Sequence, residues 1–200
     1  MRLLFNLEVT QPRHGAKRHG GGKYGEVIFK RIVERNLPMA ACYDSRKWLN
    51  PVVKELAGKY GVMLYDIAKQ NVKDIVRENG FTRIFLPLED YSGLASIEGC
   101  EAYGTIHGLR ALELKYDSYM KRYASLSFYS RMVFLVKRFC PKLGYKHARD
   151  WFLSALHNDN FRFVMVSHHS ANTMHAYFPV KRQDGTSPYS TRPLHRPTES

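Results

Sequence analysis

The stretch QPRHGAKRHGGGKYGEVIFK, residues 11–30, decides how this chain begins to fold. It follows a short apolar run at residues 3–9 and leads into Val27 and Ile28, the first apolar residues of a helical pattern. A strand, a loop and a helix are therefore expected in this order. Three glycines are expected just ahead of the helix, where a backbone without Cβ atoms turns sharply and brings its N–H groups close to a ligand. They are Gly20, Gly21 and Gly22.

The glycine stretch suits an anionic ligand. The first turn of a helix leaves backbone N–H groups unpaired and carries the positive end of the helix dipole, so amides that already point outward bind a phosphate or diphosphate there. Lys17, Arg18 and Lys23 add positive charge nearby. The spacing is interpreted as neither that of a Walker loop, GxxxxGK[ST], nor GxGxxG. A flexible, solvated connection is the alternative interpretation, because glycine is common in all loops.

Length and composition indicate one substantial globular domain. The chain has 200 residues, 44% of them hydrophobic, which is enough for a core. No run approaches the roughly 18 apolar residues that cross a bilayer, and the N-terminus lacks the pattern of a secretory signal, so a cytoplasmic location is expected. Three widely spaced cysteines without a CxxC pair predict reduced, partly buried thiols. These are Cys42, Cys100 and Cys140.

Positive charge is concentrated in two regions. The formal net charge is +13; residues 11–35 hold seven Lys or Arg against two Glu, and residues 109–150 hold ten against three acidic residues. Nucleotide phosphates, a lipid headgroup surface or nucleic acid are the candidate partners of these regions. The basic and aromatic residues 115–139 predict a helix. Three interpretations of this helix stay open. It packs on the core with a charged outer face, it lies on an anionic membrane surface, or it binds nucleic acid.

Apolar segments alternate between strand-like and helical patterns along most of the chain. The expected strands are residues 3–9, 37–43, 62–65, 82–86, 101–106 and 161–166. The first expected helix ends near Asn36, and the others span residues 51–60, 69–79, 115–139, 147–157 and 170–177. Gly61 and Gly80 are expected to end the helices at 51–60 and 69–79. This alternation predicts an α/β, Rossmann-like fold with a mostly parallel sheet flanked by helices. Ligands bind beyond the carboxyl ends of such strands, where the glycines, residues 87–90 and His107 are expected to gather. Residues 180–200 have no apolar periodicity and predict a disordered tail.

Three motifs in order resemble a known family. They are the glycines before the first helix, GTIHGLR at residues 104–110, and FVMVSHHSAN at residues 163–172. Over residues 1–179 the chain resembles the N-terminal half of retaining glycosyltransferases of the GT-B fold, family 4 type. In that family a glycine-rich loop follows the first strand, a histidine lies at the tip of a middle strand, and a serine turn begins a late helix.

The resemblance implies transfer of a sugar from a nucleotide-sugar donor to a saccharide or lipid-linked acceptor. The nucleotide-sugar would be a co-substrate, and no metal or other cofactor would be needed. His107 would be the catalytic residue beside the transferred sugar. The donor diphosphate would contact Gly20, Gly21, Gly22 and Lys23. The acceptor side or its rim would be formed by Lys17, Arg18, Arg110 and Ser167.

The chain departs from the family in two ways. The aspartate that usually follows the histidine is Gly108 here, so no aspartate is available to orient His107. The family's second, donor-binding domain has no counterpart in the 200 residues. The chain is therefore expected to be a truncated half-enzyme that is inactive alone.

Other interpretations stay open. His107 fits a histidine satisfied by the backbone at the core edge as well as one that binds a sugar or moves a proton. His168 and His169 are adjacent, so they point in different directions, and no third ligand is spaced to complete a metal site. The alternative functions are a non-catalytic basic module that binds RNA or an anionic surface, and an inactive remnant. Lipid-linked acceptors favour peripheral association at the inner membrane face over nucleic acid.

Overall fold

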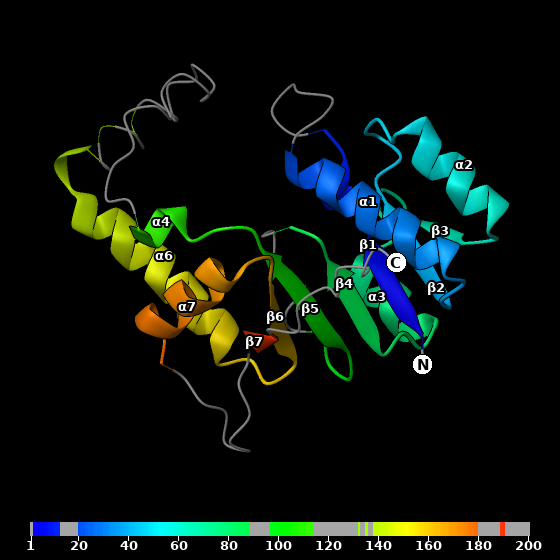
Figure 1. The fold of residues 1–200 in the computed structure, drawn as a ribbon. Coiled ribbons are helices and arrows are strands. Elements are labelled where there is room, and N and C mark those ends of the chain that lie inside the picture. Colours follow the sequence, from blue (N-terminus) through cyan, green and yellow to red (C-terminus); the bar gives the residue numbers. More distant parts are fainter. Residues whose placement is uncertain are drawn as a thin grey trace, which may run out of the picture.

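One parallel sheet organises the molecule. The computed structural model describes residues 2–12, 20–88, 97–113, 132, 135, 138–179 and 189–190. The strands are β1 (Leu3–Asn6), β2 (Met39–Tyr43), β3 (Met63–Asp66), β4 (Arg83–Leu86), β5 (Glu101–Ile106), β6 (Phe161–Met165) and β7 (Tyr189–Ser190). They lie in the order β3-β2-β1-β4-β5-β6-β7, and every neighbouring pair is parallel (Figure 1). The predicted α/β fold with a parallel sheet is confirmed.

Helices connect the strands and cover both faces of the sheet. They are the short 3₁₀ turn η1 (Glu8–Thr10), α1 (Gly20–Glu34), α2 (Pro51–Lys59), α3 (Val72–Glu78), α4 (Arg110–Glu113), α6 (Pro141–Leu156) and α7 (His168–Tyr177). In Figure 1, α1 and α2 lie on one side of the sheet and α3 on the other. This arrangement is the one that right-handed crossovers produce when the strand order reverses.

Two apolar cores follow from the alternation of side chains along the strands. Phe5 of β1 and Ala41 of β2 face α1 and α2, where they pack with Phe29 and Val33. The neighbouring residues point the other way and join a larger core with α3, α4, α6 and α7. That core includes Leu4, Cys42, Ile75, Ile84, Ile106, Leu112, Phe152, Phe163 and Met174. A strand buried on both sides explains the nearly continuous apolar runs of β1 and β2.

Local signals set most helix ends. The side chains of Asn50, Asn71 and Ser167 each accept a hydrogen bond from the first turn of α2, α3 and α7, which satisfies an otherwise unpaired amide. Gly61 and Gly80 follow α2 and α3 with positive φ values of 62° and 63°, a conformation that glycine adopts without steric cost. The expectation that these two glycines end helices is confirmed.

The starts of α1 and α6 differ from the expected ones. Gly20, Gly21 and Gly22 form the first turn of α1 itself instead of a loop ahead of it. Helix α6 begins at Pro141, whereas the sequence predicts a helix only from residue 147. Proline is favoured at the first position of a helix, because its missing N–H would be unpaired there in any case.

The segment 115–139 and the C-terminal tail are described only in part. Most of the predicted helix at residues 115–139 lies outside the described residues, and it stays a prediction. Within the expected tail, Tyr189–Ser190 pair in parallel with β6 as β7. The other residues from 180 to 200 lie outside the described part of the chain.

Candidate functional site

The strand order reverses between β1 and β4. From β1 the chain runs outward through β2 to β3, and after α3 it returns to the other side of β1 and continues from β4 to β6. Loops that leave β1 and β4 at their carboxyl ends therefore diverge, and in sheets of this type ligands bind in the crevice between them. The N-terminal turn of α1 and the residues that follow β4 lie at this point (Figure 1).

Glycines let α1 approach the end of β4 closely. A Cβ atom on Gly21 would lie 2.1 Å from a methyl carbon of Leu88, and one on Gly25 would lie 2.5 Å from Cγ2 of Thr10 and 3.1 Å from Cγ of Pro87. All three separations are shorter than van der Waals contact, so larger residues would force the Leu88 side chain or α1 itself to move. The close packing of the first turns of α1 depends on these two glycines.

The spacing of these glycines carries a second signal. Gly20, Gly22 and Gly25 follow the pattern GxGxxG, a dinucleotide-binding fingerprint whose third glycine allows tight packing of the helix against the sheet. The interpretation that the spacing is not GxGxxG is therefore wrong, because it left Gly25 out of the motif. One difference remains: the fingerprint normally follows its strand directly, whereas β1 ends at Asn6 and α1 begins at Gly20.

His107 lies just beyond β5, half-buried, and contacts two other elements. Its Nε2 atom is 2.9 Å from the carbonyl oxygen of Pro87, at the end of β4. Its ring meets the ring of Tyr24 from α1 in a T-shaped contact with centroids 4.6 Å apart. Contacts therefore connect α1 with the ends of β4 and β5. Gly20, Gly21 and Gly22 form the glycine turn, the first turn of α1, and Tyr24 follows in the second turn.

Tyr24 completes this site, although it is not among the residues that the sequence predicts for it. Burial raises the pKa of its hydroxyl, and a hydrogen bond with the Thr105 side chain offsets part of that shift. Thr105 is fully buried in β5 and shares a strand face with His107. The available signal is helical spacing, since Gly21, Tyr24 and Gly25 lie on one face of α1.

A second group of polar residues follows β2. The carboxylate of Asp44 is almost fully buried and accepts hydrogen bonds from Nε and Nη2 of Arg46 at 2.8 and 2.9 Å. These bonds, with Lys47 nearby, lower the pKa of Asp44 to about 2. Lys47 also pairs with Glu8. An acid at the end of β2 often binds a ribose in dinucleotide-binding folds, but this one is occupied by Arg46 and anchors the turn.

Gln11 holds the same turn from the other side. Its side chain is buried, accepts a hydrogen bond from the Asp44 N–H at 2.7 Å, and donates to the carbonyl oxygens of Asp44 and Lys47 at 2.9 and 3.1 Å. The end of the β1 segment is thereby fixed to the turn after β2. Nothing in the local sequence predicts this contact, because its partners lie more than thirty residues away.

The remaining predicted site residues are only partly brought together. Lys23 is exposed near the start of α1. Ser167 caps α7 by accepting a hydrogen bond from the Ser170 N–H, and the register of Ile106 with Met165 places it on the same sheet edge as His107. Arg110 begins α4, but its side chain is not among those described. Lys17 and Arg18 lie outside the described residues.

A histidine–carboxylate contact joins helices α4 and α7. Nε2 of His169 in α7 is 3.0 Å from Oε1 of Glu113 in α4, and the Thr173 hydroxyl donates to the same oxygen. Of the two adjacent histidines, His169 therefore has a carboxylate partner. In the described part of the chain no group of three or more His, Cys, Asp or Glu side chains could hold a metal ion.

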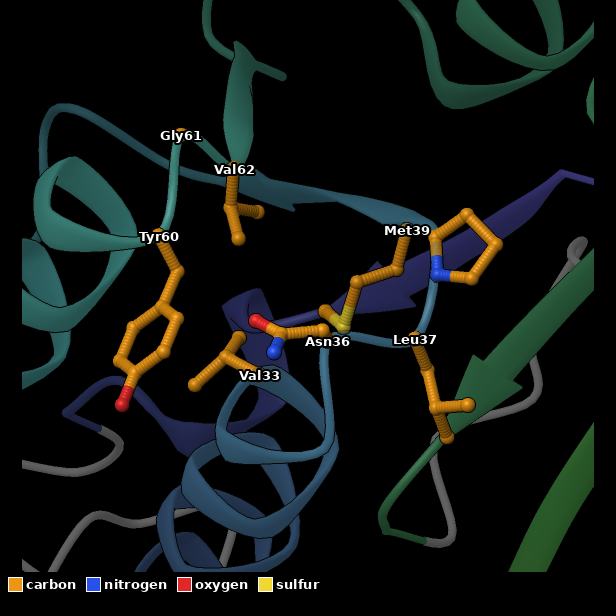
Figure 2. Close-up of a pocket in the computed structure, with 8 residues that line it drawn as sticks. Val33, Asn36, Leu37, Met39, Tyr60, Gly61 and Val62 are labelled. Carbon is orange, nitrogen blue, oxygen red and sulfur yellow. The ribbon is translucent and has the colours of Figure 1, made fainter.

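A small cavity of about 240 Å³ lies at the opposite edge of the sheet. Figure 2 shows Tyr60 and Val62 on one side of it and Leu37 and Met39 on the other, with Val33 of α1 nearby. These residues flank the amino ends of β2 and β3. The cavity is therefore separate from the site that contains His107.

No known protein family, curated protein or solved structure matches this chain. Among the described helices, none is long and apolar enough to cross a membrane. Any function must therefore be argued from the residues at the carboxyl edge of the sheet. These are the glycine turn of α1, His107 with its two partners, and the cap of α7.

Proposed function

We propose that this chain is the acceptor-side domain of a GT-B-type glycosyltransferase, which takes part in sugar transfer from a nucleotide-sugar to a saccharide or lipid-linked acceptor. One observation carries the proposal. The glycine turn of α1 lies where the strand order reverses, and Tyr24, from the second turn of the same helix, contacts His107. Two of the three motifs that resemble the family are thereby joined at one place.

The glycine turn would take the donor diphosphate. Gly20, Gly21 and Gly22 form the first turn of α1, and a helix N-terminus favours a negative charge. Lys23 adds a mobile cation beside them. Amides and cations arranged in advance stabilise a departing diphosphate without reorganisation during the reaction.

His107 would lie beside the transferred sugar, and Ser167 and Arg110 would line the acceptor side. His107 and Ser167 follow neighbouring parallel strands, so a ligand over the carboxyl edge of β5 and β6 can meet both. Like the assignment of the activity, the roles of these residues are supported by the resemblance and by their shared edge.

Titration calorimetry of the whole chain with UDP, GDP and their sugar conjugates tests the proposal. We expect saturable binding of a nucleoside diphosphate. Lys23→Ala should weaken it by about three- to tenfold, which corresponds to the loss of one exposed charge-assisted contact, about 1 kcal/mol. Lys30→Ala is the matched control, because Lys30 is also exposed on α1 but pairs with Glu34 further along the helix.

Two outcomes would contradict the proposal. A folded chain that binds none of these nucleotides has no donor contact at the glycine turn. A chain that binds RNA, with an affinity that falls steeply as salt rises, is a phosphate-backbone binder instead. Far-UV circular dichroism of each variant confirms that the chain is folded before binding is compared.

A further inference from the structure

We propose that Tyr24 is a positioning residue which, together with the carbonyl of Pro87, holds His107 with its proton on Nε2. The inference concerns a residue to which neither the sequence motifs nor the family resemblance gives a role. Two contacts of the His107 imidazole support this role, one with the carbonyl of Pro87 and one with the ring of Tyr24.

The contact with Pro87 defines the tautomer. A backbone carbonyl oxygen can only accept a hydrogen bond, and Nε2 of His107 lies 2.9 Å from it. Nε2 must therefore carry a proton. In a neutral imidazole one ring nitrogen is a donor and the other an acceptor. Nδ1 then bears the lone pair, and any proton that neutral His107 accepts goes to Nδ1.

The contact with Tyr24 fixes the plane of the imidazole. The two rings are nearly perpendicular, at 89°, with centroids 4.6 Å apart, which is a favourable geometry for aromatic rings. Tyr24 is itself held against β5, since its hydroxyl is buried beside Thr105. Rotation of the imidazole away from Pro87 would break this packing.

This arrangement orients His107 without the aspartate that follows the histidine in the resembled family. Gly108 stands where an aspartate usually follows the histidine in the resembled family, and a glycine cannot orient an imidazole. A backbone carbonyl does not titrate, so the proton on Nε2 does not depend on the ionisation of a neighbouring carboxylate. Pro87 also packs against Gly25 of α1, which couples the position of α1 to that of His107.

The catalytic meaning of the inference rests on the proposed function, whereas the tautomer does not. In a sugar-transfer site, the fixed tautomer and ring plane would hold His107 in one orientation toward the transferred sugar. Without such a reaction, the same geometry still predicts which nitrogen is protonated. The two claims can therefore fail separately.

Nuclear magnetic resonance of the whole chain labelled with ¹⁵N-histidine tests the inference without any ligand. Multiple-bond ¹H–¹⁵N correlations distinguish the two tautomers, and the spectrum of His107→Gln identifies the signals of His107. At a pH where the imidazole is neutral, we expect the proton on Nε2, with a hydrogen resonance that is protected from exchange with water by the bond to Pro87.

Variants of Tyr24 separate positioning from simple folding. Tyr24→Phe keeps the ring and should keep the protected Nε2 proton. Tyr24→Leu should expose that proton, so that its resonance broadens through exchange with water while the chain stays folded. Tyr60→Leu is the control, because Tyr60 lies beside the distant cavity and should leave the His107 signals unchanged.

A proton on Nδ1 in the wild-type chain would overturn the inference, and this result needs no variant to fold. Unchanged His107 signals in a folded Tyr24→Leu chain would overturn the role of Tyr24. The calorimetric experiment with nucleotides reports separately on the proposed function. A protected Nε2 proton in a chain that binds no nucleotide would keep the positioning claim and remove the glycosyltransferase.

Discussion

Single glycines in α1 differ in the space around them, although three of them are adjacent in sequence. Among the described residues, a Cβ atom on Gly20 would meet nothing within 4 Å, one on Gly21 would meet the flexible end of Leu88, and one on Gly25 would meet Thr10 and the rigid ring of Pro87. Thr10 cannot turn away easily, because its hydroxyl donates to the Leu7 carbonyl. The role of each glycine therefore depends on its neighbour.

Alanine substitutions should lower the stability of the chain most at Gly25, less at Gly21 and least at Gly20. We expect Gly25→Ala to lower the free energy of unfolding by about 1–3 kcal/mol, the usual effect of overpacking, and Gly21→Ala to lower it less, because the Leu88 side chain can move. Gly20→Ala should be neutral or stabilising by up to about 1 kcal/mol, since alanine favours a helix. Urea denaturation measures all three. Equal effects at the three positions would contradict the close packing.

The three cysteines should react with an alkylating reagent at different rates. Burial raises the pKa of the Cys42 thiol to about 12 and that of Cys100 to about 11, so both stay protonated near neutral pH and are poor nucleophiles. Cys140 is exposed. Iodoacetamide should therefore modify Cys140 first in the native chain, and the other two only in denaturant. Mass spectrometry of tryptic peptides follows this, and early labelling of Cys42 would contradict it.

At the scale of elements, Gln11 joins the segment after β1 to the turn after β2. Replacement by alanine would leave the buried N–H and carbonyl groups of that turn without their partner. We expect Gln11→Ala to lower the free energy of unfolding by about 1–3 kcal/mol, the cost of leaving a buried polar group unpaired. Gln70→Ala, which removes only a solvent-exposed bond to Glu78, is the control and should change it by less than about 0.5 kcal/mol.

The same turn should respond to acid. The pKa of Asp44 is about 2 in the folded chain and about 3.9 in an unfolded one. The stability that its ionised form contributes is therefore complete above about pH 4 and is lost as the pH falls toward 2. Asp44→Asn should be less stable than wild type at pH 7, and this difference should shrink below about pH 4. Thermal unfolding across this range measures it, and a constant difference would contradict the role of the charge.

Elements with clear local signals are predicted well from the sequence. Strand β5 has the expected bounds, and Gly61 and Gly80 end their helices as expected. The predicted start of α1 is wrong, because three consecutive glycines favour a loop in the sequence. Their place in the helix depends on its packing against Leu88 and Pro87, which the sequence does not show. Within the site, His107 is predictable as a residue at a strand end. Tyr24 and Gln11 are not, because their contacts join segments that are distant in sequence.

At the scale of the whole molecule, alternating strands and helices predict a parallel sheet but not its strand order. The reversal between β1 and β4 depends on which side of β1 receives the strand after α3. No local pattern encodes that choice. It is nevertheless the choice that brings α1, Pro87 and His107 together.

The rates of amide hydrogen exchange should reflect the order of the strands in the sheet. Strands β1, β4 and β5 each pair with two neighbours, whereas β3 pairs only with β2 among the described strands. We expect the slowest amide exchange in β1, β4 and β5 and faster exchange in β3, because an edge strand opens without disrupting the rest of the sheet. Exchange measured by mass spectrometry on peptic fragments tests this, and slower exchange in β3 than in β1 would contradict it.

The reversal of strand order also affects how the nascent chain acquires its structure. Strand β1 leaves the ribosome before both of its neighbours, and its pairing with β4 must wait until residues 83–86 have been synthesised. Such pairing between distant segments forms slowly. His107 follows later still, so a ligand that needs both α1 and His107 finds no complete site on a shorter nascent chain. Translation past β5 is therefore the earliest point at which a site that contains both α1 and His107 can form.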